Sequence, residues 1–541
     1  MTLRIDSKID IETTIIDSIG YFKSHKDFLS IKYEAESFQN TLFRLGYIEN
    51  KPEALKKIND STYYYEIQLK NKFKSLYIYY NQTEVDLAIL KSISKEVFDD
   101  YFILNFTEVE NALHIINTGI AKKGFPFSKL KLSDLKIKDS INIEAHLITD
   151  NTKQKRTIDN IIIKGYEKFP RSYLKHFLKI KPKQVFNLNT IQNKTEQLKN
   201  LNFANELKSP EVLFSKDSTT LYLYLEKARS NNFDGYLGFG TNDETNKLEF
   251  DGYLNLNLTN NLNFGESFRL LYKSDENDQK TFETNISLPY LFKTPIGADL
   301  LLRIFKKDTS FTTVNQSAKL HYQINSKNKI FAGIVSTESN NLLNEPSSSL
   351  ISDYKTQHYT IAFQFLKLQS NNLLFPLKTE YYFETGFGQR KTTFEKISQS
   401  QFTLEASNMF ELNPKNNIYI RATGSNLISD SYFENELLRF GGINSIRGFE
   451  ENSIFASLYG VLNSEYRLKL NNSIYIHSIF DAGYFENKTI NTKEKLFGYG
   501  FGFAILTKSG LLRFNYANGK NENTPFKLSN SKIHLSLTSK F

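Results

Sequence analysis

Residues 437–449 read Leu-Leu-Arg-Phe-Gly-Gly-Ile-Asn-Ser-Ile-Arg-Gly-Phe. The stretch begins with apolar side chains, carries two glycines at Gly441 and Gly442, and ends in the triplet Arg447-Gly448-Phe449. A loop of this length without the alternation of a strand needs a protected position in the fold. The segments on both sides predict that it folds back inside a membrane β-barrel, with Arg447 as its anchor.

The length, composition and net charge of the chain exclude several classes of protein. At 541 residues the chain is long enough for several domains. No run of about 18 apolar residues occurs, which excludes transmembrane helices. Cysteine is absent, so disulfides and thiol chemistry are excluded. The net charge of +9 is spread along the chain without a basic tract, so nucleic acid is not an expected partner.

The chain beyond Lys227 shows strand-length alternation and no helical pattern. Seven short polar turns divide it, and longer polar connections lie between those turns. The short turns are 259–261, 292–295, 325–328, 370–372, 413–416, 471–472 and 507–510, and the longer connections include 340–354, 427–455 and 518–530. Short turns on one side and long loops on the other are typical of outer-membrane barrels. With both ends on the short-turn side, residues 230–541 are predicted to form a 16-stranded antiparallel transmembrane β-barrel.

The last predicted strand has the chemistry of a strand that faces lipid on one side. One of its faces carries Ile533, Leu535, Leu537 and Phe541, opposite lysine, histidine, serine and threonine side chains. A soluble β-sandwich would also alternate in this way. A barrel is favoured because closure removes the sheet edges, and because every backbone polar group in lipid must be paired.

The same alternation supplies acidic partners for Arg447. Ile474, Ile476, Phe480 and Tyr484 face outward, which directs Asp481 into the lumen, and Glu465 points inward by the same count. We expect Arg447 to bridge one or both carboxylates. A bidentate arginine–carboxylate pair fixes the relative orientation of the two side chains and also strengthens the interaction between them. The plainer interpretations, a solvated loop arginine and an ordinary lumenal aspartate, stay open.

Three glycines are predicted to form the wall on which the loop lies. Gly498, Gly500 and Gly502 face inward, alternating with outward-facing aromatic side chains. Small residues in register leave room for another backbone to approach the sheet closely. These glycines are therefore the expected bed of residues 437–449.

The first predicted strand, 233–240, contains Gly235, Gly238 and Gly240, and glycine weakens strand pairing. This strand must close the barrel against residues 531–541, which include Leu535, Leu537 and Phe541. A weak seam between the first and last strands would suit a lateral gate through which a client strand passes into lipid. Local bending of the strand is the plainer role of the same glycines.

Residues 1–229 carry a repeat in place of the barrel pattern. Helical patterns end near Gly46, Gly124 and Asn202, spaced 78 residues apart (124 − 46 and 202 − 124), and these residue types tolerate the left-handed conformation that closes a helix. Two strand-like stretches follow each helix end, and a strand precedes each of the last two helical parts, at 73–80 and 158–164. The predicted unit is β-α-α-β-β, used three times. The three α+β modules cover residues 1–71, 72–152 and 153–229.

Four segments of the barrel region resemble one family in their order along the chain. Residues 440–449 resemble its sixth-loop motif, and 462–467, 480–483 and 498–517 resemble its strand-twelve, strand-thirteen and strand-fourteen-to-fifteen patterns. The family is the BamA/TamA-like superfamily of outer-membrane assembly and translocation proteins, to which two-partner-secretion transporters are related. The N-terminal repeats resemble its POTRA domains, with 161–166 similar to the opening strand and turn.

The resemblance implies a protein of the bacterial outer membrane with its POTRA-like modules in the periplasm. It implies unfolded outer-membrane or secreted polypeptides as clients, which add a strand to an exposed sheet edge and then pass through or beside the barrel seam. Outer-membrane lipid and accessory periplasmic or lipoprotein subunits are the other implied partners. Two alternatives remain: a two-partner-secretion transporter with one dedicated client, and, from another class, a passive diffusion porin with a periplasmic scaffold.

Enzyme motifs are absent from the sequence. It contains no Gly-x-Ser-x-Gly elbow, no phosphate-binding glycine loop and no His-x-x-x-His pair. We therefore expect no enzymatic activity, no cofactor and no metal. An exported protein should begin with an apolar signal segment, and the residues after Met1 do not form one. Either this is a mature form or the export interpretation is wrong.

Overall fold

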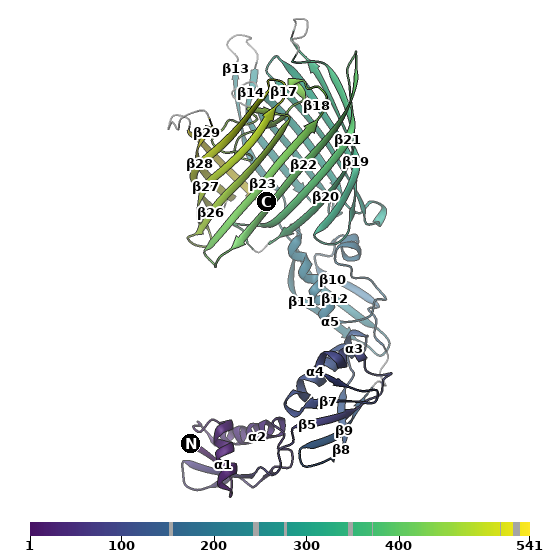
Figure 1. The fold of residues 1–541 in the computed structure, drawn as a ribbon, viewed down its shortest axis with the longest axis vertical. Helices are drawn as coiled ribbons and strands as arrows, with labels where there is room; N and C mark the ends of the chain where they lie inside the picture. The colour runs from purple at the N-terminus through teal and green to yellow at the C-terminus, as the bar shows by residue number, and fades with distance from the viewer. Residues whose placement is uncertain are drawn as a thin grey trace. The chain divides into compact units, whose positions relative to one another are not determined.

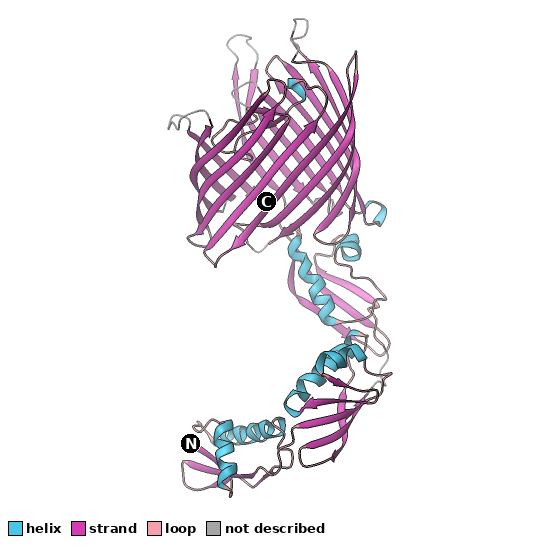
Figure 2. Cartoon of the chain, viewed as in Figure 1, coloured by secondary structure: helices cyan, strands magenta, loops and turns pink. Residues whose placement is uncertain are grey.

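The computed structural model describes residues 1–150, 155–241, 248–274, 279–343, 350–369, 372–508, 510–522 and 531–540. It contains small α+β modules followed by a large β-barrel (Figures 1 and 2). The chain forms two compact units. The first contains Met1–Asn160, Pro182–Asn189 and Phe214–Thr220, and the second contains Ile161–Lys181, Thr190–Leu213 and Leu221–Phe541. No described helix is long and apolar enough to cross a membrane.

The first module places two helices on a small sheet. Its elements are β1 (Thr2–Asp6), α1 (Asp10–Ile19), α2 (Phe28–Arg44), β2 (Lys51–Pro52), β3 (Lys56–Lys57) and β4 (Thr62–Gln68), with β1 and β4 parallel. Helix α2 begins at a capping box formed by Asp27 and Ser30, and it buries Ile31, Phe38 and Leu42. These apolar residues recur at helical spacing, so one face of α2 packs into the core of the module.

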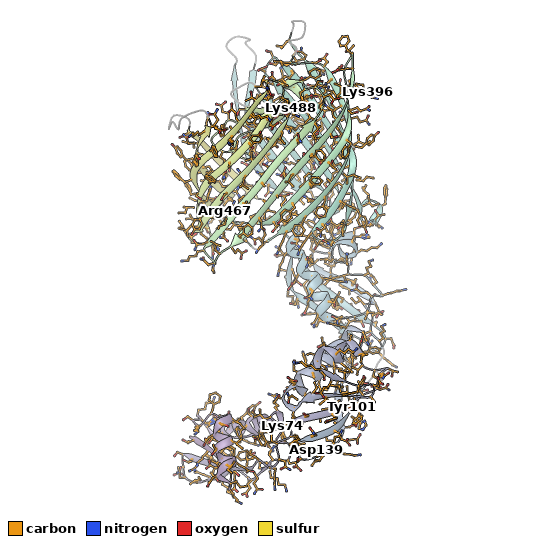
Figure 3. The ribbon with its side chains drawn as sticks, in the orientation of Figure 1. Lys74, Tyr101, Asp139, Lys396, Arg467 and Lys488 are labelled. Carbon is orange, nitrogen blue, oxygen red and sulfur yellow. The ribbon has the colours of Figure 1, made fainter. Side chains whose placement is uncertain are left out.

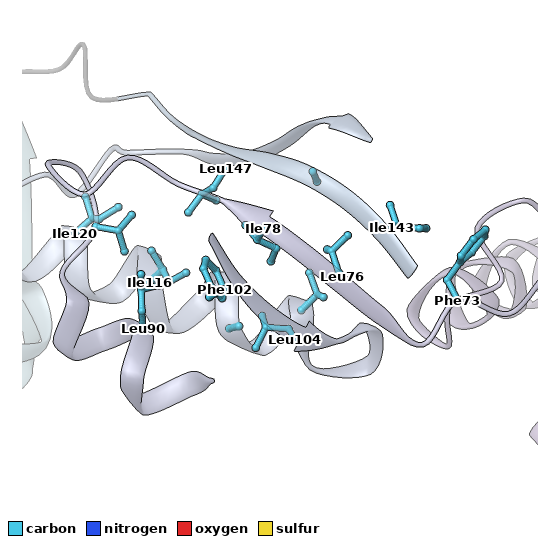
Figure 4. Packing of buried hydrophobic residues seen from close by; sticks show 14 residues of the cluster. Phe73, Leu76, Ile78, Leu90, Phe102, Leu104, Ile116, Ile120, Ile143 and Leu147 are labelled. Carbon is cyan, nitrogen blue, oxygen red and sulfur yellow. The ribbon is translucent and has the colours of Figure 1, made fainter. Parts of the chain in front are cut away.

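The second module has more strands than the predicted unit. Its elements are β5 (Ser75–Tyr79), α3 (Leu87–Ile93), β6 (Glu96–Val97), β7 (Tyr101–Asn105), α4 (Val109–Lys122), β8 (Leu130–Ile137) and β9 (Asn142–Thr149). The strand order is β6-β7-β5-β9-β8, so a hairpin of β6 and β7 lies between the two helices in the sequence. The predicted β-α-α-β-β order is therefore wrong here. Phe102 of β7 joins the core that also contains Leu76, Ile78 and Ile116 (Figure 4).

The third module follows the predicted order. Its elements are β10 (Asn160–Gly165), a π-helical turn (Tyr173–Phe177), α5 (Leu188–Thr195), β11 (Ala204–Phe214) and β12 (Thr219–Lys227). The sheet order is β10-β12-β11, which places the second strand of the closing hairpin in the centre.

Two of the three predicted helix ends adopt the left-handed conformation. Gly46 has φ 98° and Gly124 has φ 102°. A Cβ on Gly46 would overlap the carbonyl oxygen of Phe73, so glycine is required there for space as well as for conformation. The prediction for Asn202 is wrong, because Asn202 is not among the described residues with positive φ. The helix ends instead in a 3-10 turn, which extended Leu201 follows.

Sixteen antiparallel strands form the barrel, as predicted. Their order in the sheet is their order in the sequence. They are β13 (Asn232–Thr241), β14 (Leu248–Thr259), β15 (Ser267–Ser274), β16 (Gln279–Leu288), β17 (Ile296–Lys307), β18 (Phe311–Gln323), β19 (Asn328–Asn341), β20 (Tyr354–Leu368), β21 (Leu377–Lys391), β22 (Lys396–Glu411), β23 (Asn416–Ile428), β26 (Leu458–Lys469), β27 (Ile474–Asn487), β28 (Thr492–Thr507), β29 (Gly510–Asn521) and β30 (Ser531–Lys540). Two short strands, β24 (Leu438–Phe440) and β25 (Ile454–Ala456), pair with each other in the loop after the eleventh barrel strand, which we call loop six.

The two faces of the barrel differ as the alternation predicts. Tyr466, Phe480 and Phe501 are exposed on the outside, whereas Glu465 and Asp481 are buried on the inside. We call the end that carries the seven turns predicted from the sequence the short-turn end, and the other end, which carries loop six, the long-loop end. Short connections also occur at the long-loop end, between β17 and β18 and between β21 and β22. Figure 3 labels Arg467 near the short-turn end and Lys488 near the long-loop end.

One short turn folds into the barrel. Leu374 and Phe375, between β20 and β21, are almost fully buried against Met409, Tyr475 and Ala504, which lie on β22, β27 and β28. The ring centroids of Phe375 and Tyr475 are 4.8 Å apart. An apolar cluster, which we call the turn cluster, therefore lies on the lumenal side of the short-turn end.

Tyr173 joins the third module to the first two short turns of the barrel. Its ring lies 4.8 Å from that of Tyr290, and its hydroxyl donates to the carbonyl oxygen of Gly265 at 3.2 Å. Nearby, the Tyr166 hydroxyl donates to Asn263 Oδ1 at 2.7 Å. Burial raises the pKa of Tyr173 well above its usual range, so its hydroxyl stays a neutral donor.

Replacing Tyr173 by phenylalanine should loosen this joint without unfolding it. The ring contacts remain, and the lost hydrogen bond contributes about 0.5–1.5 kcal/mol. Hydrogen exchange of the backbone amides of residues 166–177 should become faster, while exchange in the barrel strands stays the same. As a control, Tyr224→Phe removes a hydroxyl that bonds Glu211 within the third module and should leave residues 166–177 unchanged. Equal exchange in Tyr173→Phe and the unmodified protein would contradict the prediction.

Candidate functional site

Arg447 lies inside the barrel between two carboxylates. Its Nε and Nη2 donate to Asp481 Oδ2 and Oδ1 at 2.8 and 2.5 Å, and its Nη1 donates to Glu465. The backbone N–H of Arg447 also donates to Asp481 Oδ2, at 2.9 Å. The Arg447 side chain is 5% exposed and that of Asp481 is fully buried. The structure thus brings together the three side chains that the sequence analysis paired.

A second arginine balances the charge of the group. Arg467 Nε donates to Glu465 Oε2 at 2.7 Å, and its guanidinium lies 4.0 Å from the ring centroid of Tyr419. Two guanidinium groups therefore face two carboxylates in a region shielded from water. Buried charges are tolerated when each is paired and hydrogen-bonded in this way.

Glycines let the loop backbone touch the wall. A Cβ on Gly498 would overlap the carbonyl oxygen of Arg447, and one on Gly519 would overlap that of Gly448. Gly448 itself has φ 90°. At Gly500 and Gly502 the nearest atoms belong to neighbouring barrel strands. The bed is thus made by Gly498 and Gly519, and the expectation that Gly500 and Gly502 support the loop is not met.

The remaining loop residues named from the sequence pack close by. Gly441 and Gly442 have φ of 117° and 93°, and side chains there would collide with the backbone or side chain of Glu450 and Glu451. Phe449 packs against a buried cluster that includes Ile446. Loop six therefore turns sharply twice, and an apolar cluster holds its tip beside the arginine.

Several contacts of the loop were missed by the sequence analysis. Asn463 Nδ2 donates to the carbonyl oxygen of Ser445 at 2.7 Å, and Arg421 Nη1 donates to that of Asn444 at 2.6 Å. Asn463 lies two residues before Glu465 on the same inward face, so the alternation could have pointed to it. No signal in the sequence indicates which loop carbonyl it meets. Within the described ranges, no group of three His, Asp or Glu side chains is arranged to hold a metal ion.

The seam between the first and last strands is short. Among the described residues, β13 pairs with β30 through two residue pairs, Asn232–Lys540 and Phe233–Ser539, whereas β13 and β14 share ten. A third contact is made by a side chain, because the Asp234 carboxylate accepts a hydrogen bond from the backbone N–H of Leu537.

The other residues predicted at the seam have ordinary strand positions. Gly235, with φ 148°, lies so close to the Tyr253 carbonyl that a Cβ would overlap it. Gly238 and Gly240 pair with β14. Leu535 and Leu537 are exposed on the outer face and pair with β29. Phe541 lies outside the described residues.

A sixteen-stranded barrel with a loop bound to its inner wall and α+β modules before it defines a class of outer-membrane transport and assembly proteins. The chain belongs to the Omp85 superfamily, because the family model described as the Omp85 superfamily domain matches residues 193–541. The POTRA model, described as surface antigen variable number repeat, matches residues 156–226. Members of this superfamily are outer-membrane proteins that assemble or transport other proteins, so membership supports insertion or translocation of polypeptides.

Solved structures with a similar fold come from the same class. CdiB from Escherichia coli has 14% identity and a TM-score of 0.56, over 95% of this chain and 98% of that chain. CdiB from Acinetobacter baumannii has 15% identity and a TM-score of 0.55, over 84% and 86%. BamA from Haemophilus ducreyi lacking POTRA domains 1–3 has 15% identity and a TM-score of 0.50, over 86% and 99%. At these identities the likeness concerns the fold alone. Comparison with curated proteins finds no match.

Proposed function

We propose that this chain is an outer-membrane assembly or translocation factor whose clients leave the barrel at the β13–β30 seam. The observation that carries the proposal is the two-pair seam, beside ten pairs between β13 and β14. In lipid, an unpaired backbone group costs several kcal/mol, so a short seam is an edge that favours pairing with another strand. A client strand can supply that pairing without any nucleotide or cofactor.

Client capture is assigned to the three N-terminal modules, which we place in the periplasm. Each sheet ends in open edge strands, and the longest are β8 in the second module and β11 in the third. An extended client segment can add to such an edge through backbone hydrogen bonds, which tolerate any sequence. Accessory periplasmic or lipoprotein subunits would bind the same modules.

A cysteine pair across the seam tests this function. Phe233→Cys combined with Ser539→Cys places two thiols at facing positions of β13 and β30. We expect the oxidised protein to remain a folded barrel, yet to lose insertion of an unfolded eight-stranded outer-membrane barrel into liposomes, and reduction should restore it. The probe barrel is scored by its resistance to added protease.

The matched control locks two strands that are fully paired elsewhere. Ser317→Cys with Val335→Cys joins β18 to β19, which share thirteen residue pairs, and oxidation there should leave insertion unchanged. Full activity of the oxidised Phe233–Ser539 lock would remove the seam from the mechanism.

A second candidate is secretion of one dedicated client through the lumen. It is favoured by the cavity of about 600 Å³ beside Asp299, Lys319 and Glu384, which leaves polar space among the barrel strands. The liposome assay separates the two functions. An insertase accepts the generic barrel probe, whereas a dedicated transporter leaves it unfolded and acts only on its own partner.

A further inference from the structure

Loop six has a second buried anchor on a different wall of the barrel. Arg390 on β21 is fully buried, and its Nη1 donates to Glu436 Oε1 of the loop at 2.5 Å. Its Nη2 donates to the Ser431 hydroxyl at 2.5 Å, and its guanidinium lies 4.1 Å from the ring centroid of Phe433. Three loop residues therefore surround one barrel arginine.

Glu436 is held from several directions. Its Oε2 accepts from Gln399 Nε2 of β22 at 3.2 Å, and its Oε1 accepts from the Phe433 backbone N–H at 3.0 Å. The Glu436 side chain is 3% exposed, so its charge depends on Arg390 for compensation. The pair is as deeply buried as the Arg447–Asp481 pair.

The neighbouring loop residues are attached to further strands of the same wall. Asn435 Nδ2 donates to Ser339 Oγ of β19 at 2.9 Å, and the Tyr354 hydroxyl of β20 donates to the Asn435 carbonyl at 3.1 Å. The Arg439 guanidinium lies 3.8 Å from the ring centroid of Phe305 of β17. This set of contacts covers the wall from β17 to β22.

Arg447, in contrast, binds Glu465 and Asp481 on β26 and β27, and Gly448 lies against Gly519 on β29. Eight positions along the chain separate Arg439 from Arg447, so a short segment joins the two sets of contacts. Each set is charged or polar, buried and specific in its partners.

We propose that loop six is a strut between two walls of the barrel, with Arg390 as the positioning residue of its second anchor. The Arg447 anchor holds the tip to the β26–β29 wall, and the Arg390–Glu436 anchor holds residues 431–439 to the β17–β22 wall. Each anchor can open while the other stays closed. The proposal concerns the resting barrel and holds whether clients are inserted or secreted.

Trypsin cleaves after arginine, so each anchor of the loop has its own cleavage site. Cleavage after Arg439 reports on the Arg390–Glu436 anchor, and cleavage after Arg447 reports on the Arg447 anchor. A protease acts on the open form, so the cleavage rate follows the population in which a site leaves the wall. In the full chain reconstituted in liposomes, Glu436→Gln should make cleavage after Arg439 about tenfold faster, the change that corresponds to about 1.4 kcal/mol. Cleavage after Arg447 should stay as slow as in the unmodified protein. Mass spectrometry of the fragments distinguishes the two sites.

The control variant is Glu395→Gln. Glu395 also pairs with Arg390, at 3.1 Å, but it lies in the connection between β21 and β22 and is 46% exposed. Its loss should change neither cleavage rate. A second readout is the conductance of the protein in a planar bilayer, which needs no client and should show more frequent openings for Glu436→Gln alone.

Unchanged cleavage after Arg439 in Glu436→Gln would overturn the strut, as would equal acceleration at both sites, because the loop would then move as one piece. If Glu436→Gln does not fold, Ser431→Ala and Gln399→Ala remove single contacts of the same anchor and should accelerate cleavage after Arg439 only. Their failure to do so also overturns the proposal. None of these outcomes depends on whether the protein inserts the barrel probe.

Discussion

Arg447→Ala will release the tip of loop six from the barrel wall. Removing one partner of a buried ion pair costs about 3–5 kcal/mol, because the remaining charge is left without compensation. Here Asp481 loses three hydrogen bonds to the loop arginine if the tip leaves, and it is fully buried. Hydrogen exchange of residues 441–449 should accelerate by about a hundredfold or more, since each tenfold step corresponds to about 1.4 kcal/mol. Insertion of the barrel probe should fall with it.

A lumenal arginine outside the loop contacts provides the control. Arg269 is 45% exposed and lies 3.6 Å from Glu283, so Arg269→Ala should change loop exchange little, as expected for a solvated pair. The effects of Arg447→Ala and Asp481→Asn should be less than additive, because both break the same contact. Strictly additive effects would mean that the pair does not hold the loop. Glu465→Gln should be milder than Asp481→Asn.

Gly448→Ala should undock the same tip without changing any charge. Gly448 has φ 90°, a conformation that costs a residue with a side chain about 1–2 kcal/mol. The added Cβ would also overlap the backbone nitrogen of Gly519, and overpacking of this kind costs typically about 1–3 kcal/mol. Trypsin cleavage after Arg447 should therefore rise by more than about tenfold.

Gly460→Ala on β26 is the matched glycine control. No atom lies within 4 Å of the position of its Cβ, and its φ is not in the left-handed region. Cleavage after Arg447 should be unchanged in this variant. If Gly448→Ala behaves like Gly460→Ala, the close approach to Gly519 does not hold the loop.

Most of what could be predicted about the barrel follows from the alternation of inward-facing and outward-facing side chains along each strand. Adjacent side chains of a strand point to opposite faces of the sheet. Because Tyr466 and Phe480 face lipid, their neighbours Glu465 and Asp481 must point inward. The seven turns predicted at one end, with both ends of the barrel region on that side, then give sixteen strands. These inferences need only local pattern, because each strand pairs with its neighbours in sequence.

The parts that could not be predicted depend on contacts far apart in the chain or on very short elements. β6 has two residues, too few to show a period, so the inserted hairpin of the second module was missed. Gly519 was missed because its small size is needed only for the close approach of the Gly448 backbone, and Gly448 lies in another segment of the chain. The second anchor was missed because Arg390 looks like any charged residue near the end of a strand. Its burial comes from loop residues 41 and 46 positions away, Ser431 and Glu436.

The turn cluster around Phe375 connects the short-turn end of the barrel to loop six. Leu374 and Phe375 are almost fully buried, so the turn that carries them is held against the inner wall. The Arg467 guanidinium lies 5.3 Å from the ring centroid of Phe375, and the same guanidinium pairs with Glu465. Glu465 in turn accepts a hydrogen bond from Arg447. A displacement of the turn between β20 and β21 and a displacement of the Arg447 anchor therefore disturb the same chain of buried contacts.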